Sequence, residues 1–408
     1  MSPTIDEQLR VLMHGTEFGD EGLRQTARTE LKEALIRAQK ERRGLCVYTG
    51  YDPTRPDLHL GHATTLRKMR QFQDFGHDVI FLVGTFTAQV GDASDKNSGR
   101  PRLDAEQVRG AAMTYAEQAF TVLDRERTRV VYNGDWLSKL PLDEFTTIAS
   151  QFTVQQFLSR DSFRRRLDAG NPIGLHEFLY ALLQGYDAMY LKADVQLGAT
   201  EQLYNMMAGR RLQTSAGQPA CVCLTVPILV GTDGVRRMSK SEGNYIGLSE
   251  PPDDQYGKVM SISDETMIAW LPYVTRWSPG DIVAKLEALK AGELHPMVLK
   301  KELAAEIVSA YHGEAAASEA EAQFAQVHQD RRLPDEIPTV HFSGPRTIVE
   351  ALVEASIADS KNKARRLVDG GGVRVGGEVI KDHNHSLGAE DLSVQVGKRR
   401  FFRAVFER

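Results

Sequence analysis

Two histidines flank a glycine at a point where the chain could bind phosphate. His59 and His62, in the sequence HLGH, follow a strand-like apolar run and open a helix-type pattern that ends at Gly76. Backbone N–H groups and the dipole at a helix start attract anions, and imidazoles can donate hydrogen bonds to phosphate oxygens. Gly61 has no side chain, so a base or ribose could lie against the backbone there. The pattern is typical of a nucleotide site, although a packed or solvated histidine pair is the ordinary alternative.

A second group of polar residues lies far downstream, in the loop 237–241, which reads RMSKS. Gly234 and Gly243 flank this loop, which suggests mobility. HLGH followed at a distance by RMSKS resembles the class I aminoacyl-tRNA synthetases, and the resemblance implies ATP as a substrate. Arg237 stands where the family commonly has Lys, so a planar guanidinium replaces a point charge. Lys240 keeps the expected residue type.

A third group stands on one predicted helical face. Tyr180, Gln184 and Asp187 are spaced i, i+4 and i+7, which aligns them within an otherwise apolar helix. A solvent-facing stripe is the simple alternative, but such groups need partners if they are buried. Tyr48 ends the strand before the HLGH turn. If these residues line a crevice, an amino acid lying across it would place its side chain near Asp187 and its ammonium near Tyr180 and Gln184.

The third group, together with YTGYDPT before HLGH, resembles the tyrosyl-tRNA synthetase family within class I. The resemblance implies that Tyr48 and Asp187 bind the phenolic hydroxyl of L-tyrosine. It also implies that Asp92, Tyr180 and Gln184 hold the ammonium group. A buried pair that needs a hydroxyl is left unsatisfied by phenylalanine, which should therefore bind poorly.

The same resemblance assigns roles to the other polar residues of the predicted crevice. The tyrosine carboxylate and the ribose would contact Gln196, Glu201 and Gln202, and the chain has ATEQ where relatives often have GSDQ. Asn133 would complete the tyrosine pocket. Charge on the polyphosphate would be stabilised by His59, His62, Lys96, Arg100, Arg237 and Lys240. ATP would also contact Asp52, Thr54, Gly61, Ser239 and Ser241. Mg²⁺ would arrive with ATP, and we expect no metal site of the protein's own and no tightly bound cofactor.

These residues need a fold that brings distant loops to one edge. Between residues 44 and 246, strand-like and helical patterns alternate, which predicts an α/β, doubly wound parallel sheet (Rossmann-like) with ligands beyond the carboxyl ends of its strands. The resemblance implies that an insertion near 137–175 forms a homodimer interface. The other predicted segments are an N-terminal helical segment (1–43), an α-helical domain on the anticodon side (247–335), a linker (336–345) and a small α+β domain (346–408).

The last segment is locally basic. From Pro345 to Arg408 there are 12 Lys and Arg against 9 Asp and Glu, on a chain with a net charge of −5. Its pattern resembles a small RNA-binding fold first named for a ribosomal protein, which implies contact with tRNA(Tyr). The predicted RNA-binding residues are Lys361, Lys363, Arg365 and Arg366. A solvated charged helix is the alternative for these charges alone.

Composition limits the class of protein. The 408 residues are 41% apolar and 26% charged, as is ordinary for a globular chain with several domains. Cys46, Cys221 and Cys223 are an odd number of cysteines in apolar runs, which favours thiols in a reducing compartment. No apolar run approaches the ~20 residues of a membrane span. We therefore expect a cytoplasmic protein without a membrane partner.

Three other functions are compatible with parts of the sequence. A tryptophanyl-tRNA synthetase shares both motifs, but an indole gives no reason for the Tyr48 and Asp187 pair. Another nucleotidyltransferase could carry HLGH but would not need the basic tail. An RNA-binding protein on a decayed synthetase scaffold would not need every chemical position occupied.

Overall fold

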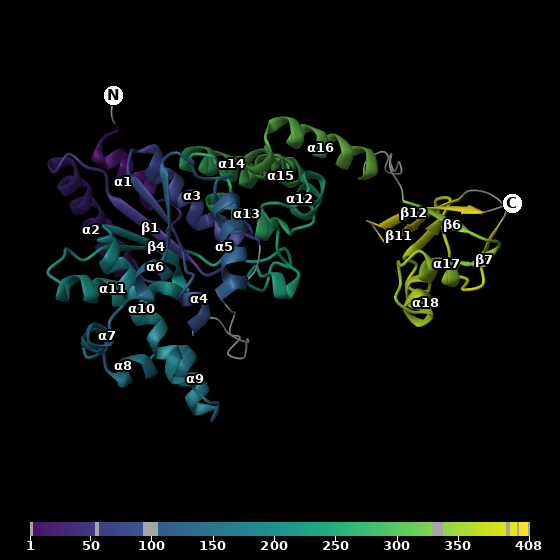
Figure 1. The fold of residues 1–408 in the computed structure, drawn as a ribbon. Coiled ribbons are helices and arrows are strands. Elements are labelled where there is room, and N and C mark those ends of the chain that lie inside the picture. Colours follow the sequence, from purple (N-terminus) through teal and green to yellow (C-terminus); the bar gives the residue numbers. More distant parts are fainter. Residues whose placement is uncertain are drawn as a thin grey trace. The chain divides into compact units, whose positions relative to one another are not determined.

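The computed structural model describes residues 3–53, 57–92, 105–328, 338–388, 392–397 and 400–406. The chain forms two compact units, residues 1–321 and 322–408. Figure 1 shows the first as a sheet covered by helices and the second as a smaller sheet with its own helices. None of the described helices is both long and apolar enough to cross a membrane.

A five-stranded parallel sheet with strand order β3-β2-β1-β4-β5 forms the centre of the first unit. Its strands are almost fully apolar inside, as expected when helices cover both faces of a parallel sheet. The predicted doubly wound α/β fold is therefore confirmed. The strands are β1 (Cys46–Tyr51), β2 (Asp78–Val83), β3 (Thr128–Tyr132), β4 (Val195–Ala199) and β5 (Val222–Val226).

The order of the strands reverses at β1, and the sheet opens there. All six residues of β1 pair with β2, but only Val47 and Tyr48 pair with β4. Beyond Tyr48 the strands β1 and β4 diverge at their carboxyl ends. Ligands of open α/β sheets bind at such a switch point, so the topology places the crevice directly after Tyr48.

The helices of the sheet domain alternate with its strands. α3 follows β1 and packs on β1, β2 and β4, while α10 and α11 pack on each other. β5 stops at Val226, although the apolar run of the sequence continues to Val230. These helices are α3 (Leu60–Asp74), α4 (Thr87–Val90), α5 (Ala105–Ala119), α10 (Leu175–Leu191) and α11 (Leu203–Ser215).

The N-terminal segment is helical, as predicted, and it packs on the sheet domain. It forms α1 (Ile5–Met13) and α2 (Glu21–Lys40). The buried Lys68 of α3 donates from Nζ to the His14 carbonyl at 2.6 Å, just beyond the end of α1. Just after the carboxyl end of α2, Arg43 binds the buried Asp194 that precedes β4. These contacts fix both helices to the sheet.

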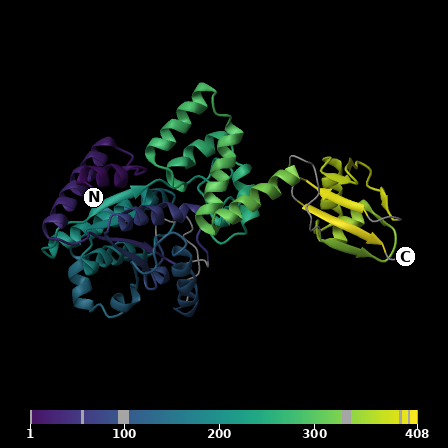
Figure 2. The same ribbon diagram turned by 90° about the horizontal axis from the view of Figure 1, so that it is seen from above.

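The insertion and the following helices extend the first unit. α6 (Gly134–Leu137) follows β3, and the insertion contains α7 (Leu142–Ala149), α8 (Val154–Leu158) and α9 (Asp161–Asp168). Figure 2 shows a further group of helices at one side of the sheet domain. This group contains α12 (Pro252–Met260), α13 (Asp264–Val274), α14 (Pro279–Ala291), α15 (Pro296–His312) and α16 (Glu314–His328).

The second unit has its own core. A five-stranded sheet of order β6-β12-β11-β8-β9 packs with α17 (Ile348–Glu354) and α18 (Lys361–Asp369) around a cluster that includes Phe342 and Phe402. β6 lies within the stretch predicted as a linker. It is instead part of the second unit, because it pairs with β12 of that unit. The five strands of this sheet are β6 (Thr339–Phe342), β8 (Val373–Val375), β9 (Glu378–Val379), β11 (Leu392–Val396) and β12 (Arg400–Phe406), while β7 (Arg346–Thr347) and β10 (Ser386–Leu387) form a separate two-stranded sheet.

Candidate active site

A crevice of about 780 Å³ lies at the carboxyl ends of β1 and β4. It gathers predicted residues from segments that are far apart in the sequence. Those that line it are Tyr48, Asp52, His59, Gly61, His62, Asp92, Tyr180, Gln184, Asp187, Gln196, Glu201, Gln202, Arg237, Ser239 and Lys240. The switch point thus joins both sequence motifs and the polar face of α10.

The two histidines cap the N-terminus of α3. His59 is the N-cap, and its Nδ1 accepts from the Gly61 N–H at 3.1 Å, while His62 Nδ1 accepts from the His59 N–H at 3.2 Å. A Cβ on Gly61 would lie 2.9 Å from His59 Cε1. Glycine is therefore needed so that the His59 ring can fold back over the helix end.

Capping fixes the protonation of both rings. Burial lowers the pKa of His59 to about 2 and that of His62 to about 4, with the nearby Lys240 charge acting in the same direction. Both imidazoles are therefore neutral at pH 7. Because each Nδ1 accepts a hydrogen bond, the proton of each neutral ring must be on Nε2. Each histidine offers one Nε2–H donor and no positive charge.

A buried carboxylate lies at the other end of the crevice. Asp187 is 2% exposed and accepts from Trp136 Nε1 at 2.8 Å and from Asn133 Nδ2 at 3.1 Å. Burial raises the pKa of Asp187, while the two donors oppose this shift by stabilising the ionised form. The Tyr48 hydroxyl and Gln184 Oε1 are buried and find no hydrogen-bond partner among the residues that the structure describes. This end of the crevice therefore holds polar atoms that a ligand hydroxyl could satisfy.

A second carboxyl group lies beside this pocket. Asp52 accepts from the Tyr180 hydroxyl at 2.9 Å and from Thr87 Oγ1 at 2.6 Å. Burial raises the pKa of Asp52 to about 7. Asp92 accepts from Gln202 Nε2 at 2.6 Å. Carboxylates so close to Tyr180 make this region suited to a cationic group such as an ammonium.

The RMSKS loop forms the opposite wall. Lys240 Nζ lies 2.7 Å from Asp57 Oδ2, and Arg237 lies 3.5 Å from Glu201. The buried Asn244 braces the loop, since it accepts from the Ser239 N–H and donates to the Arg237 carbonyl. The segment after the loop runs beside the first motif, with the Leu60 N–H donating to the Ile246 carbonyl. Backbone contacts therefore hold the two motifs together.

Several predicted residues lie elsewhere. Thr54, Lys96 and Arg100 lie outside the described residues. Ser241 is exposed and bonds Ser239 rather than lining the crevice. Asn133 is fully buried behind Asp187, so its contact with a ligand would be through that carboxylate.

Sequence reasoning did not single out four residues of the site. Trp136 donates to Asp187, and Thr87 donates to Asp52. Asp57 pairs with Lys240, and Asn244 holds the RMSKS loop. Trp136 lies three residues after the predicted Asn133, in the sequence NGDW, and this proximity was the only sequence feature that pointed to it. The other three depend on contacts between segments that the sequence does not pair.

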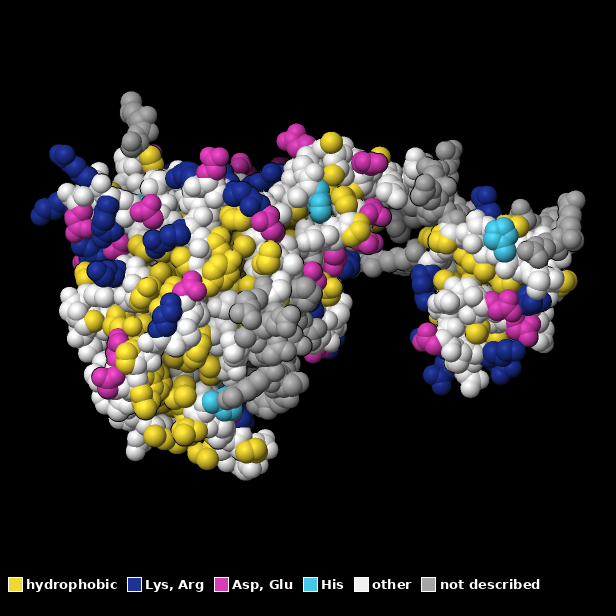
Figure 3. All heavy atoms as spheres, viewed as in Figure 1, with side chains coloured by type: hydrophobic (Ala, Val, Ile, Leu, Met, Phe, Trp, Pro, Cys, Tyr) yellow, Lys and Arg dark blue, Asp and Glu magenta, His cyan; other side chains and the backbone are white. Residues whose placement is uncertain are grey.

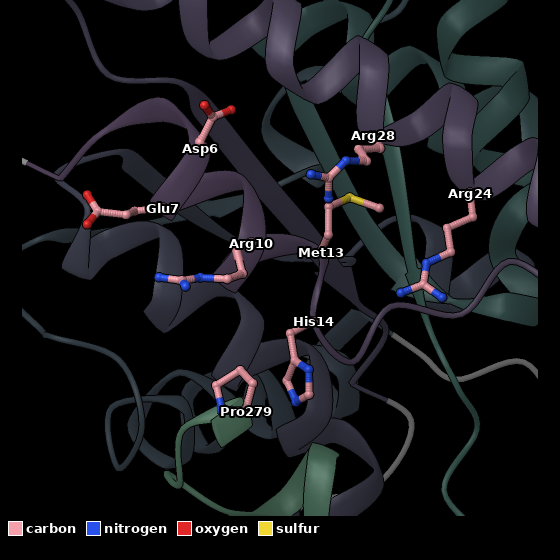
Figure 4. Close-up of a pocket in the computed structure, with 8 residues that line it drawn as sticks. All are labelled: Asp6, Glu7, Arg10, Met13, His14, Arg24, Arg28 and Pro279. Atoms are coloured by element: carbon pink, nitrogen blue, oxygen red, sulfur yellow. The ribbon is translucent and has the colours of Figure 1, made fainter. Parts of the chain in front are cut away.

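A separate hollow of about 600 Å³ lies between α1, α2 and the start of α14 (Figure 4). Arg10, Arg24, Arg28 and His14 line it, together with Asp6 and Glu7. Lys32 pairs with Asp6, and Glu7 caps α1 through Thr4. No predicted site residue lies in this hollow, and its carboxylates serve the local structure.

Family models match almost the whole chain. The model of the tRNA synthetases class I (W and Y) matches residues 40–329. The model of the Tyrosine--tRNA ligase SYY-like C-terminal domain matches residues 330–402. The second match continues where the first ends, so both units are represented.

Curated relatives give the same result over nearly full length. A Tyrosine--tRNA ligase of Geobacter sulfurreducens is 44% identical over 381 residues, covering 92% of this chain and 94% of the relative. One of Mannheimia succiniciproducens is 46% identical, covering 92% and 95%. One of Aquifex aeolicus is 42% identical, covering 98% and 99%.

Solved structures share the fold. The tyrosyl-tRNA synthetase of Archaeoglobus fulgidus, complexed with L-tyrosine, matches with a TM-score of 0.59 and 23% identity, covering 78% of this chain and all of that one (100%). The tryptophanyl-tRNA synthetase of Plasmodium falciparum matches with a TM-score of 0.54 and 14% identity, covering 71% and 80%. At these identities the likeness concerns the fold alone.

Asp52→Asn should make the ligand-free protein more stable at alkaline pH. The pKa of the Asp52 carboxyl rises from 3.8 to about 7 on folding. Its contribution to the free energy of unfolding is therefore fully present below pH ~4 and is lost as the pH rises through 7. At pH 8 the variant should gain about 1–2 kcal/mol, allowing for solvent in the crevice, and at pH 4 it should match the wild type. Thermal unfolding across this range would measure the difference. Asp74→Asn, on the exposed face of α3, is the control, and an equal gain there would contradict the assignment.

Proposed function

Because the chain belongs to the tyrosine--tRNA ligase family of class I aminoacyl-tRNA synthetases, we propose that Tyr48 and Asp187 bind the phenolic hydroxyl of L-tyrosine. The observation that carries the proposal is the buried, unpartnered Tyr48 hydroxyl beside a buried carboxylate held by two donors. The substrate hydroxyl would donate to Asp187 and accept from Tyr48, whose phenol stays protonated because burial raises its pKa. Phenylalanine would leave both groups unsatisfied.

The enzyme catalyses two steps. In the first, a carboxylate oxygen of tyrosine attacks the α-phosphorus of ATP, the bond to the β-phosphate oxygen breaks, and pyrophosphate leaves. In the second, a hydroxyl at the 3′ end of tRNA attacks the tyrosyl carbonyl and AMP leaves. The first step gains mainly from positioning and from stabilising charge on the phosphates.

The crevice would hold the two reactants side by side. Tyr180, Asp52 and Asp92 support an ammonium site next to the hydroxyl pocket. At the other end, the Nε2–H groups of His59 and His62 would donate to phosphate oxygens as neutral dipoles. Lys240 and Arg237 would supply the positive charge. Gln202 and Glu201 would contact the carboxylate and ribose between these ends.

We expect ATP to enter as its Mg²⁺ complex. Among the described residues, Asp52, Asp57, Asp187 and Glu201 are engaged by hydroxyl, amide, indole or cationic side chains of the chain itself. They supply no dedicated cage for a metal ion, so the phosphates would carry it. Exchange assays at stepped Mg²⁺ concentrations would test this.

We also place the enzyme in the cytoplasm, where tRNA charging supports translation. Cys46, Cys221 and Cys223 are free thiols in the structure, as expected for a reducing compartment. Cell fractionation with immunodetection would test the placement.

Trp136→Phe should weaken tyrosine binding. The variant removes the indole donor to Asp187 but keeps an aromatic ring in the same apolar cluster. Loss of one hydrogen bond to a buried carboxylate should raise the KM for tyrosine about 10-fold in ATP–pyrophosphate exchange. Tyr190→Phe, whose ring stacks on Trp136, should change little. An unchanged KM in Trp136→Phe, or exchange supported by tryptophan, would refute the proposed pocket.

Arg365→Ala with Arg366→Ala should impair tRNA charging. In the described structure Lys361 and Lys363 pair with Glu350 and Asp359, whereas no ion partner of the two exposed arginines is found. Loss of two phosphate contacts should raise the KM for tRNA about 10-fold and flatten its salt dependence. Tyrosine-dependent exchange should stay at the wild-type rate. Lys363→Ala is the matched control and should have a smaller effect, while normal charging by the double variant would refute the role of α18.

We propose a homodimer formed through the insertion. Leu142, Leu175, Val154 and Leu167 are 78%, 76%, 60% and 55% exposed, which is unusual for a monomer surface. Figure 3 shows hydrophobic side chains gathered on the face of the first unit that is turned to the viewer, around α10. Leu142→Asp with Leu175→Asp should convert a dimer to a monomer in analytical ultracentrifugation. Val283→Asp on α14 should leave the mass unchanged, and a monomeric wild type would contradict the proposal.

A further inference from the structure

Both cations of the RMSKS loop are paired with carboxylates across the crevice. Lys240 Nζ lies 2.7 Å from Asp57 Oδ2, with 10% of the lysine side chain and 50% of the aspartate side chain exposed. Arg237 and Glu201 form the second, longer pair. Asp57 comes two residues before His59, so the Lys240 pair joins the loop directly to the histidine motif.

The Lys240 ammonium lies at the end of the crevice where phosphate is expected. Its charge lowers the pKa of both His59 and His62, which places it near the two rings. It is too buried to remain without an anion at low cost. In the structure, Asp57 supplies that anion.

We propose that Asp57 is a positioning residue that holds Lys240 in the ATP-free enzyme and releases it to the phosphates of ATP. The inference rests on the proposed phosphate-binding role of Lys240. A carboxylate oxygen and a phosphate oxygen compete for the same ammonium, so binding of ATP must break the Asp57 pair. The same competition acts on the product, since Asp57 recaptures Lys240 as pyrophosphate leaves.

Asp57 therefore opposes the binding of both ATP and pyrophosphate. Asp57→Asn keeps the shape of the side chain but removes its charge. We expect the KM for ATP and the inhibition constant of pyrophosphate to fall together by about 3- to 6-fold, as for a partly exposed ion pair. The rate constant of adenylate formation should stay within about 2-fold. Salt screens exposed charges, so both gains should shrink at high ionic strength.

Single-turnover adenylate formation, followed over a range of ATP concentrations, would test the proposal. Asp57→Glu retains the charge and should keep a KM near that of the wild type. Glu242→Gln breaks the Arg236 pair within the same loop and should leave the KM for ATP unchanged. A fall in KM in Glu242→Gln as well would assign the effect to loop loosening and overturn the proposal.

Lys240→Met separates this inference from the proposed function. If ATP binds this variant as tightly as the wild type in equilibrium dialysis, the phosphate-binding role of Lys240 is wrong. If Lys240→Met weakens ATP binding but Asp57→Asn leaves it unchanged or weakens it, only the role of Asp57 is wrong. In the expected case, Asp57→Asn tightens ATP binding and has no further effect when Lys240 is already Met.

Discussion

Burial of the Asp187 carboxylate constrains much of the sheet domain. A buried carboxylate is costly unless donors surround it, and here the donors come from separate elements. Asn133 follows β3, Trp136 lies on α6, and Asp187 lies on α10. These elements must be fixed relative to one another for the carboxylate to be tolerated. The apolar cluster of Tyr48, Leu183 and their neighbours fixes them by packing, so part of the core also lines the candidate pocket.

The end of the crevice where we propose that phosphate binds differs, because its two buried histidines carry no charge. A buried pair of cationic imidazoles with ring centroids 3.9 Å apart would repel, and burial keeps both rings neutral. Positive charge comes instead from Arg237 and Lys240 of the RMSKS loop, which pair with Glu201 and Asp57. Neutral dipoles and positive charges are thus divided between the helix end and the loop.

The sequence was informative wherever local spacing determined placement. HLGH at a strand-to-helix turn and the i, i+4, i+7 face of Tyr180, Gln184 and Asp187 predicted side chains that do line one crevice. Contacts between distant segments were not predictable in this way. Nothing in the spacing indicated that Trp136 would donate to Asp187 or that Asp57 would pair with Lys240. Similarly, the Pro-rich stretch around β6 looked like a linker because its pairing partner, β12, lies about 60 residues later.

The divergence of β1 and β4 after Tyr48 has a consequence for how the enzyme uses its binding energy. The gap follows from the strand order and from the short pairing of β1 with β4. Substrates therefore need not separate packed layers on entry, and little of their affinity is lost to rearranging the sheet. Variation in this rigid frame would alter folding, whereas variation in the side chains at its edge would tune selectivity. Because Tyr48 belongs both to the core cluster and to the lining of the crevice, a change of selectivity at this edge must also preserve the packing of the sheet domain.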